Sequence, residues 1–139
     1  MNDETDHPSP ESVHGTVLCI EDHAASMDLV EAMLARYGGV HLLKAYTGAD
    51  GIRLAQAARP DLVLLDMRLP DISGLDVVRA LNQLMSERQL RVVLLTADSF
   101  SIEVVKAMSL GAHEYWPKPL TLERIESGLL RLLGGPSRA

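Results

Sequence analysis

The stretch LVLLD at positions 62–66 joins an unbroken apolar run to a single acid. Two other stretches are built in the same way: TVLCI at 16–20 is followed by two acids, and VVLL at 92–95 is followed by a threonine. Runs of Val, Ile and Leu without alternation are typical of strands buried on both faces, as in a parallel sheet. Two weaker strands fit at 41–46 and 113–116. The sequence therefore predicts a sheet of five parallel strands.

Segments of helical length lie between these runs, with apolar residues three or four positions apart. Gly38 closes the first segment, Pro60 stops the second and Gly111 closes the fourth. Ser73 is a suitable N-cap for the third, because Asp76 follows three residues later. Strands that alternate strictly with helices predict an α/β fold, a doubly wound (βα)5 sheet with right-handed crossovers.

The size and charge of the chain limit its domain organisation. Its 139 residues, 47% hydrophobic and 23% charged, are typical of one globular domain. The first 15 residues hold four acids and no Lys or Arg, and so carry −4 of the formal charge of −6. We expect a disordered acidic leader at 1–15, a folded domain at 16–133 and a short flexible tail at 134–139.

The composition also argues against several classes of protein. A formal charge of −6 is unsuited to direct, nonspecific nucleic-acid binding, which needs a basic face. No apolar run approaches the roughly 20 residues of a membrane-spanning helix, and the polar N-terminus is unlike a signal peptide. The single cysteine, Cys19, excludes an internal disulfide and fits a reducing compartment. We expect a cytoplasmic protein without a membrane or nucleic-acid partner, with Cys19 as a buried apolar residue.

Polar side chains follow the strands at the point where each is expected to end. Glu21 and Asp22 follow the first strand, Asp66 the third, Thr96 the fourth and Lys118 the fifth. In an open parallel sheet, ligands bind at the carboxyl ends of the strands, so these side chains are expected to meet. Three carboxylates repel one another unless a cation is present, and a few hard oxygen ligands suit Mg²⁺. A threonine and a lysine opposite the metal suit a phosphoryl group.

Four motifs stand in order at these strand ends: Glu21-Asp22; 66–70 (DMRLP) with Gly74 eight residues after its acid; Thr96-Ala97; and Lys118-Pro119. Together they resemble the receiver domain of two-component response regulators, in the single-domain form of the chemotaxis regulators. The resemblance covers about 16–133. It implies a flavodoxin-like fold with strand order 2-1-3-4-5.

The resemblance also implies the roles of the acids. In that family the aspartate after the third strand accepts a phosphoryl group from a partner's phosphohistidine, which places the phosphoacceptor at Asp66. Asp22, Asp66 and the backbone carbonyl of Met67 are expected to bind Mg²⁺ or Mn²⁺, with Glu21 supporting a bound water molecule or the lysine. Self-catalysed phosphoryl transfer and slow autodephosphorylation are expected, but no other enzymatic activity.

The remaining roles concern the phosphoryl group and the switch. Thr96 and Lys118 are expected to bind phosphoryl oxygens, and the bond before Pro119 to be cis. Tyr115, three residues before the lysine, is the aromatic residue that rotates inward on phosphorylation in this family. The surface of the fourth helix, fifth strand and fifth helix is the expected partner face.

Some residues depart from the family pattern. Arg68 and Asp98, two positions after the phosphoacceptor and the threonine, flank the route of attacking water and are expected to modulate dephosphorylation. His23 follows the acid pair, and we interpret it as a loop residue, leaving open a contact with the water shell of the metal. Trp116 is expected beside the site, where its fluorescence reports Mg²⁺, and Pro117 fits only an edge strand.

The resemblance implies a sensor histidine kinase or a histidine phosphotransfer protein as phosphodonor. It also implies a protein target that the sequence does not identify, and it allows a phosphorylation-dependent homodimer. We expect a stand-alone regulator without an output domain; a receiver excised from a hybrid sensor kinase is the alternative. A Mg²⁺-dependent aspartyl-phosphate phosphatase needs an acid where Arg68 stands, which disfavours it. A docking module that no longer switches is the remaining possibility.

Overall fold

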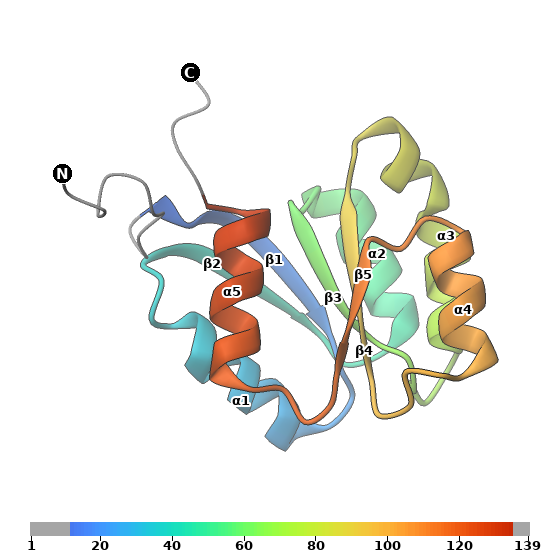
Figure 1. Cartoon of the computed structure of the whole chain (residues 1–139). Helices are drawn as coiled ribbons and strands as arrows, with labels where there is room; N and C mark the ends of the chain where they lie inside the picture. The colour runs from blue at the N-terminus through green and yellow to red at the C-terminus, as the bar shows by residue number, and fades with distance from the viewer. Residues whose placement is uncertain (1–11, 135–139) are drawn as a thin grey trace, which may run out of the picture.

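Five strands and five helices alternate along the chain in the computed structural model, which describes residues 12–134 (Figure 1). The strands are β1 (His14–Ile20), β2 (Gly39–Ala45), β3 (Leu62–Asp66), β4 (Arg91–Thr96) and β5 (Glu114–Pro117). The helices are α1 (Ala24–Leu34), α2 (Gly48–Ala58), α3 (Gly74–Glu87), α4 (Ile102–Ser109) and α5 (Leu122–Leu132). Within the described part of the chain, no helix is long and apolar enough to cross a membrane.

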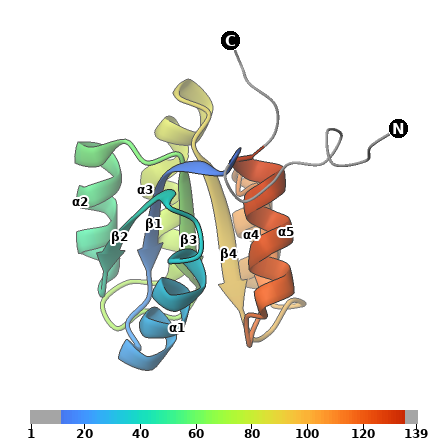
Figure 2. The ribbon, with the colours of Figure 1, turned by 90° about the vertical axis from the view of Figure 1, so that its left-hand side faces the viewer.

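The strands form one parallel sheet in the order β2-β1-β3-β4-β5, which confirms the flavodoxin-like fold. Figure 2 shows β2, β1, β3 and β4 side by side. Helices α1 and α5 cover one face of the sheet, and α2, α3 and α4 cover the other (Figure 1). The crossovers therefore bury both faces, as expected for strands of unbroken apolar sequence.

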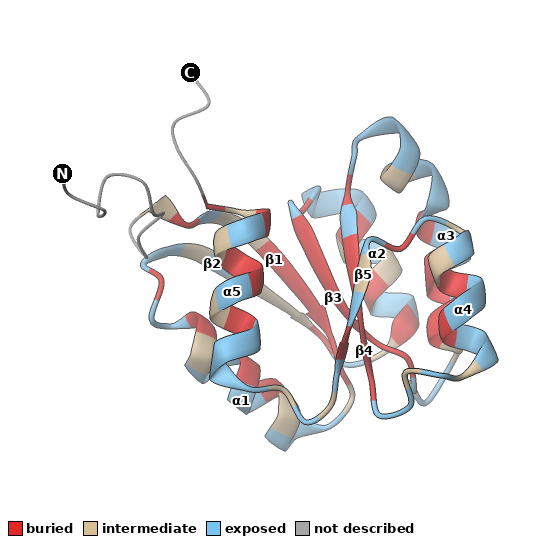
Figure 3. Cartoon of the chain, in the orientation of Figure 1, coloured by how far each residue is buried: buried red, intermediate tan, exposed pale blue. Residues whose placement is uncertain are grey.

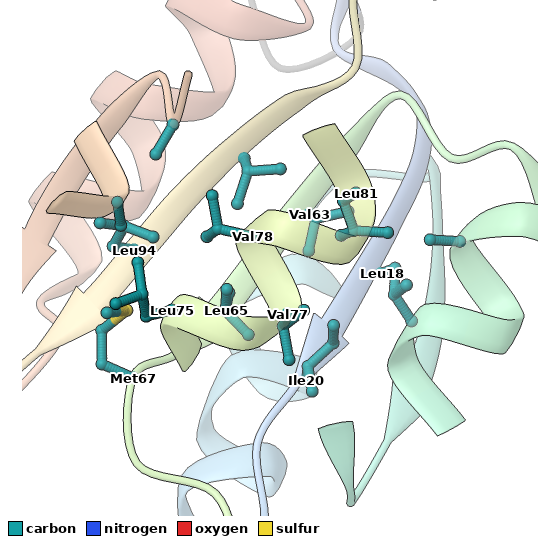
Figure 4. Packing of buried hydrophobic residues seen from close by; sticks show 14 of the residues in the cluster. Leu18, Ile20, Val63, Leu65, Met67, Leu75, Val77, Val78, Leu81 and Leu94 are labelled. Carbon is teal, nitrogen blue, oxygen red and sulfur yellow. The ribbon is translucent and has the colours of Figure 1, made fainter. Parts of the chain in front are cut away.

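The central strand β3 is buried at every residue (Figure 3). Its side chains alternate between two separate cores. Val63 and Leu65 pack with α2, α3 and α4 (Figure 4), while Leu62 and Leu64 pack with α1 and α5. Asp66 ends the strand and is the first polar side chain along it. The apolar run thus places the Asp66 carboxylate at the end of β3, next to both hydrophobic cores.

The strands differ by one or two residues from the sequence-based expectation, and β3 and β4 include Asp66 and Thr96, which were expected to follow them. β1 begins at His14, two residues early, and the side chain of Val13 before it is fully buried. β2 spans 39–45 instead of 41–46, and β5 spans 114–117 instead of 113–116. β5 pairs only with β4, so Pro117 lies on an edge strand as expected. Residues 1–11 of the expected leader (1–15) and residues 135–139 of the expected tail (134–139) lie outside the described residues.

The third helix begins as predicted, at an N-cap formed by Ser73, whose hydroxyl accepts a hydrogen bond from the Asp76 amide at 3.1 Å. The next residue, Gly74, lies against the chain just after β3, where an added Cβ would be 2.7 Å from Met67 Cα. Only glycine allows this approach. Gly74 therefore fixes where α3 starts relative to β3.

We expect the substitution Gln89→Gly to stabilise the protein by about 0.5–1 kcal/mol. Gln89, just after α3, has a φ of 57°, and a residue with a Cβ pays about 1 kcal/mol for this left-handed conformation. Urea unfolding measures the change, with Ala80→Gly on the exposed side of α3 as the matched control. The control should lose about 1 kcal/mol, because its backbone is helical. A Gln89→Gly variant less stable than the parent would contradict the prediction.

Candidate functional site

The carboxyl ends of the strands gather the predicted polar residues at one edge of the sheet. Asp66 ends β3 and Thr96 ends β4, whereas Glu21 and Lys118 directly follow β1 and β5. A cavity of about 210 Å³ opens there. Its lining consists of His23, Asp66, Met67, Arg68, Leu95, Thr96, Ala97, Asp98, Ser101, Glu103 and Lys118.

Lys118 joins the two most deeply buried acids. Its Nζ donates a hydrogen bond to Glu21 Oε1 at 2.9 Å and lies 3.4 Å from Asp66 Oδ2. Glu21 is 1% exposed and Asp66 is 3% exposed, so water screens this interaction poorly. The ammonium group therefore compensates part of the negative charge of both carboxylates.

The pKa values of the two buried acids, Asp66 and Glu21, are shifted in opposite directions. Burial, together with the interaction with Glu21, raises the pKa of Asp66 from 3.8 to about 6. Burial alone would also raise the pKa of Glu21, but interactions with Asp66 and Lys118 and the His23 amide outweigh it and lower that pKa. The pKa of Lys118 is raised, because the two carboxylates outweigh its burial. Near neutral pH, the Asp66 carboxylate is thus ionised but poorly stabilised.

The donor set of the site fits a divalent cation. Ligand atoms of Glu21, Asp22, His23 and Asp66 all lie within 4.8 Å of one another. Asp22 Oδ1 and Asp66 Oδ2 are buried and accept no hydrogen bond from any residue that the structure describes. Buried carboxylate oxygens that accept no hydrogen bond are costly, and a cation would lower this cost further than the Lys118 ammonium does alone. Oxygen-rich sites with few protein ligands are typical of Mg²⁺.

One of the expected metal ligands, the backbone carbonyl of Met67, already accepts a hydrogen bond. The carbonyl oxygen of Met67 accepts a hydrogen bond from the Gly74 amide at 3.1 Å, which directs it toward the start of α3. The Arg68 amide donates to Asp66 Oδ1 at 3.0 Å. One oxygen of Asp66 is thereby held by the backbone, while Oδ2 faces Lys118.

The hydroxyl group of Thr96 is held by the loop that follows β4. It donates to the carbonyl of Asp98 and accepts from the Asp98 amide, both at 3.0 Å. Asp98 turns its carboxylate to the Phe100 amide. Within residues 12–134, Arg68 and Asp98 form no ion pair with each other, although both line the cavity. The Lys118–Pro119 peptide bond is cis.

The two aromatic residues of β5 lie on opposite faces of the sheet. Tyr115 pairs with Leu94, which faces α3 and α4, and its side chain is 39% exposed. Trp116 is fully buried in the other core, and its indole donates to Glu114 Oε1 at 2.9 Å. The expectation that Trp116 lies beside the site is wrong, because strand alternation points its ring toward α5. Neither residue lines the cavity.

Two residues of the cavity, and a third on the loop between β3 and α3, were not anticipated from the sequence. Ser101 and Glu103, at the start of α4, line the cavity. Asp71 accepts hydrogen bonds from the amides of Gly48 and Ala49 at 2.8 and 2.9 Å, and these bonds lower its pKa. The position of Ser101 before an apolar helix is an N-cap signal. No local pattern points to Asp71, because its partners lie more than 20 residues away.

The sequence is similar to several known proteins, among them transcriptional regulatory proteins. The chain is 38% identical over 119 residues to the probable transcriptional regulatory protein TcrX of Mycobacterium tuberculosis, covering 85% of this chain and 49% of TcrX. It is 29% identical over 119 residues to the protein PilH of Pseudomonas aeruginosa, covering 86% of this chain and 98% of PilH. With AfsQ1 of Streptomyces coelicolor (38% identical over 105 residues), it matches 76% of this chain and 45% of AfsQ1. The chain thus spans about half the length of TcrX and AfsQ1.

Solved structures have the same fold. The receiver domain of the sensor histidine kinase PA1611 of Pseudomonas aeruginosa, with a magnesium ion in its active-site cleft, matches with a TM-score of 0.75 and 26% identity, covering 86% of this chain and 97% of that chain. The chemotaxis protein CheY4 of Vibrio cholerae matches with a TM-score of 0.77 and 23% identity, over 86% of this chain and 99% of that chain.

The family model of the response regulator receiver domain matches residues 17–129. This range runs from β1 into α5 and includes every strand end described above. Because the match covers most of the chain, the protein belongs to the family of response regulator receiver domains, which act in two-component signalling as phosphoacceptor switches and not as catalytic enzymes.

Proposed function

We propose that Asp66 is the phosphoacceptor and that it receives the phosphoryl group from the phosphohistidine of a sensor kinase or a histidine phosphotransfer protein. Receiver domains are phosphorylated by histidine kinases. One observation carries the assignment to this residue: Asp66 Oδ2 is buried, lacks a hydrogen bond within the described chain and lies 3.4 Å from the Lys118 ammonium. The same proposal includes this histidine-containing phosphodonor, an unidentified protein target, and the cytoplasm as the place where the phosphoryl group is transferred.

Asp66 Oδ2 attacks the phosphorus atom, and the bond between phosphorus and the histidine nitrogen breaks. The bonding pair leaves with the imidazole, and an acyl phosphate forms on Asp66. Lys118 offsets charge on the phosphoryl oxygens, and the Arg68 amide holds Oδ1 in place at 3.0 Å. The hydroxyl of Thr96 reaches the new phosphate after leaving the Asp98 backbone.

Receiver domains bind Mg²⁺ in their acidic site, and Asp22 and Asp66 fit that ion here. Glu21 is engaged by Lys118, so we assign it a contact through water. The carbonyl of Met67 is used by Gly74, whereas the carbonyl of Arg68 accepts no hydrogen bond within the described residues. We therefore propose the Arg68 carbonyl as the backbone ligand in place of Met67. Bound Mg²⁺ or Mn²⁺ would neutralise charge on the transferred group.

The switch is proposed to run from Thr96 through Tyr115 to the face of α4, β5 and α5. Tyr115 is 39% exposed on the α4 side of the sheet, and we propose that it moves inward there. Large apolar side chains are exposed near this face, including Phe100, Ile102 and Val105. This surface is proposed to bind the target or a second phosphorylated copy. Arg68 and Asp98, at the cavity mouth, are proposed to modulate hydrolysis of the acyl phosphate.

A stand-alone regulator is the favoured context. Support comes from PilH, of which the chain covers 98%. The hybrid-kinase alternative rests on the kinase BarA of Escherichia coli, which is 28% identical over 120 residues and of which the chain covers 13%.

We expect incubation with acetyl phosphate and Mg²⁺ to add one phosphoryl group to the parent protein and none to Asp66→Asn. Intact-protein mass spectrometry measures the addition, and hydroxylamine should release it as expected of an acyl phosphate. Asp76→Asn, at an exposed acid of α3, is the matched control and should be phosphorylated like the parent. Phosphorylation of Asp66→Asn, or none in the parent, would refute the proposal.

A further inference from the structure

His23 lies between the acids of the site. Its Nδ1 is 3.3 Å from Asp22 Oδ1 and 3.4 Å from Glu21 Oε2. Its backbone is fixed, because its amide donates to Glu21 Oε2 at 3.2 Å and its carbonyl accepts from the Met27 amide at 2.9 Å. The side chain is 70% exposed, and its Nδ1 shares a hydrogen bond with Glu21 Oε2.

We propose that His23 supplies a nitrogen ligand to the cation of this site, and that it makes the site select late first-row metals such as Ni²⁺ and Co²⁺ over Mg²⁺. The inference rests on the metal site proposed above. It changes the interpretation of His23 from a loop residue to a residue that determines metal specificity.

The spacing of the donor atoms supports a shared cation. In an octahedral site with bonds of about 2.1 Å, neighbouring ligand atoms lie about 3 Å apart and opposite ones about 4.2 Å apart. The distances from Nδ1 to the two carboxylates, 3.3 and 3.4 Å, are close to the first value. All four donor residues have a ligand atom within 4.8 Å of the others, so a small inward shift brings them within the 4.2 Å that an octahedral site allows.

Two carboxylate oxygens without a hydrogen bond are an independent sign of a missing ligand. Asp22 Oδ1, the oxygen nearest to the imidazole, is buried without a hydrogen bond in the described chain, and Asp66 Oδ2 is buried with only the Lys118 ammonium nearby, at 3.4 Å. His23 lines the same cavity as Asp66. A cation bound by these oxygens would therefore lie within reach of Nδ1.

The chemical type of the ligand atoms determines which metal binds more tightly when His23 is a ligand. Mg²⁺ prefers oxygen ligands and gains little from an imidazole. Affinity for nitrogen ligands rises from Mn²⁺ through Co²⁺ to Ni²⁺, so the imidazole favours the later metals. With three acids and one histidine, the site has the mixed donor set that borderline metals accept.

Separate calorimetric titrations with MgCl₂ and NiCl₂ test the inference on the parent chain and on His23→Asn. We expect the Ni²⁺ affinity to fall about tenfold or more in His23→Asn, on the scale of a lost ligand contact, and the Mg²⁺ affinity to change less than about threefold. The visible absorption of bound Co²⁺ gives a second measurement, since loss of a nitrogen ligand shifts its bands. His41→Asn, an exposed histidine of β2, is the matched control and should leave both affinities unchanged.

The outcomes separate this inference from the proposed function. Equal effects of His23→Asn on both metals, or no effect on either, would overturn the role of His23. In either case Asp22→Asn should still abolish Mg²⁺ binding, which leaves the proposed phosphoacceptor site intact. A parent chain that binds neither metal would overturn both proposals.

Discussion

In metal-free solution at pH 7.5, Asp66→Asn is expected to be more stable than the parent protein by about 2–3 kcal/mol. Burial and the interaction with Glu21 raise the pKa of Asp66 to about 6, so the ionised carboxylate destabilises the folded state. The amide has nearly the same shape and carries no charge. Urea unfolding in the presence of a chelator measures the difference, and Asp76→Asn, at an exposed acid, should change little.

The raised pKa of Asp66 also predicts the direction in which the stability of the parent protein changes with pH. The pKa of Asp66 is higher in the folded protein than its usual 3.8, so the folded state binds the proton more tightly. Stability of the parent should therefore rise as the pH falls from 7.5 through about 6 toward 4, and Asp66→Asn should lack this rise. Excess Mg²⁺ should stabilise the parent and leave Asp66→Asn unaffected. A variant no more stable than the parent without metal would contradict the prediction.

The second large effect is expected at Gly128 of α5, which faces the buried ring of Trp116. A Cβ at this position would be 2.6 Å from Trp116 Cη2. The ring has no free space, since it is fully buried between the sheet and α5. We expect Gly128→Val to destabilise the protein by about 3 kcal/mol and Gly128→Ala by about 1–3 kcal/mol, because overpacking outweighs the gain in helix propensity.

Gly38→Ala is the matched control, because a Cβ there meets no atom within 4 Å. It should be neutral or slightly stabilising. Combining Gly128→Ala with Trp116→Leu should cost less than the two single changes together, since the smaller side chain makes room for the new methyl group. Gly128→Ala as stable as the parent would show that the ring can move away, contrary to the expectation.

The sequence predicts the central part of the fold because strands buried on both faces leave unbroken apolar runs. The run at 62–65 also locates Asp66, since the first polar residue after such a run stands at the carboxyl end of the sheet. The same reasoning brings Thr96 and Lys118 to one edge. Fold and site were predictable together, because one rule places both.

What the sequence did not predict depends on pairing between distant segments. β1 extends back to His14 because His14 pairs with Gly39 on β2, and no apolar residue marks that pairing. The face of Trp116 follows from its register with Leu95, and a shift of one residue would reverse it. The hydrogen bond from Gly74 to the Met67 carbonyl is likewise a contact across a loop. Such contacts leave no periodic signal.

The chain between β3 and α3 is fastened in three places. The Arg68 amide binds Asp66, the Asp71 carboxylate binds two amides of α2, and the Gly74 amide binds the Met67 carbonyl. The opposite side of the cavity, from Thr96 to Ser101, depends largely on hydrogen bonds to Thr96 and Asp98 within the same short turn. The proposed phosphorylation site is thus bounded on one side by a loop bound to neighbouring elements and on the other by a turn held mainly by its own hydrogen bonds. Structural change on phosphorylation is expected to travel in one direction only, toward α4.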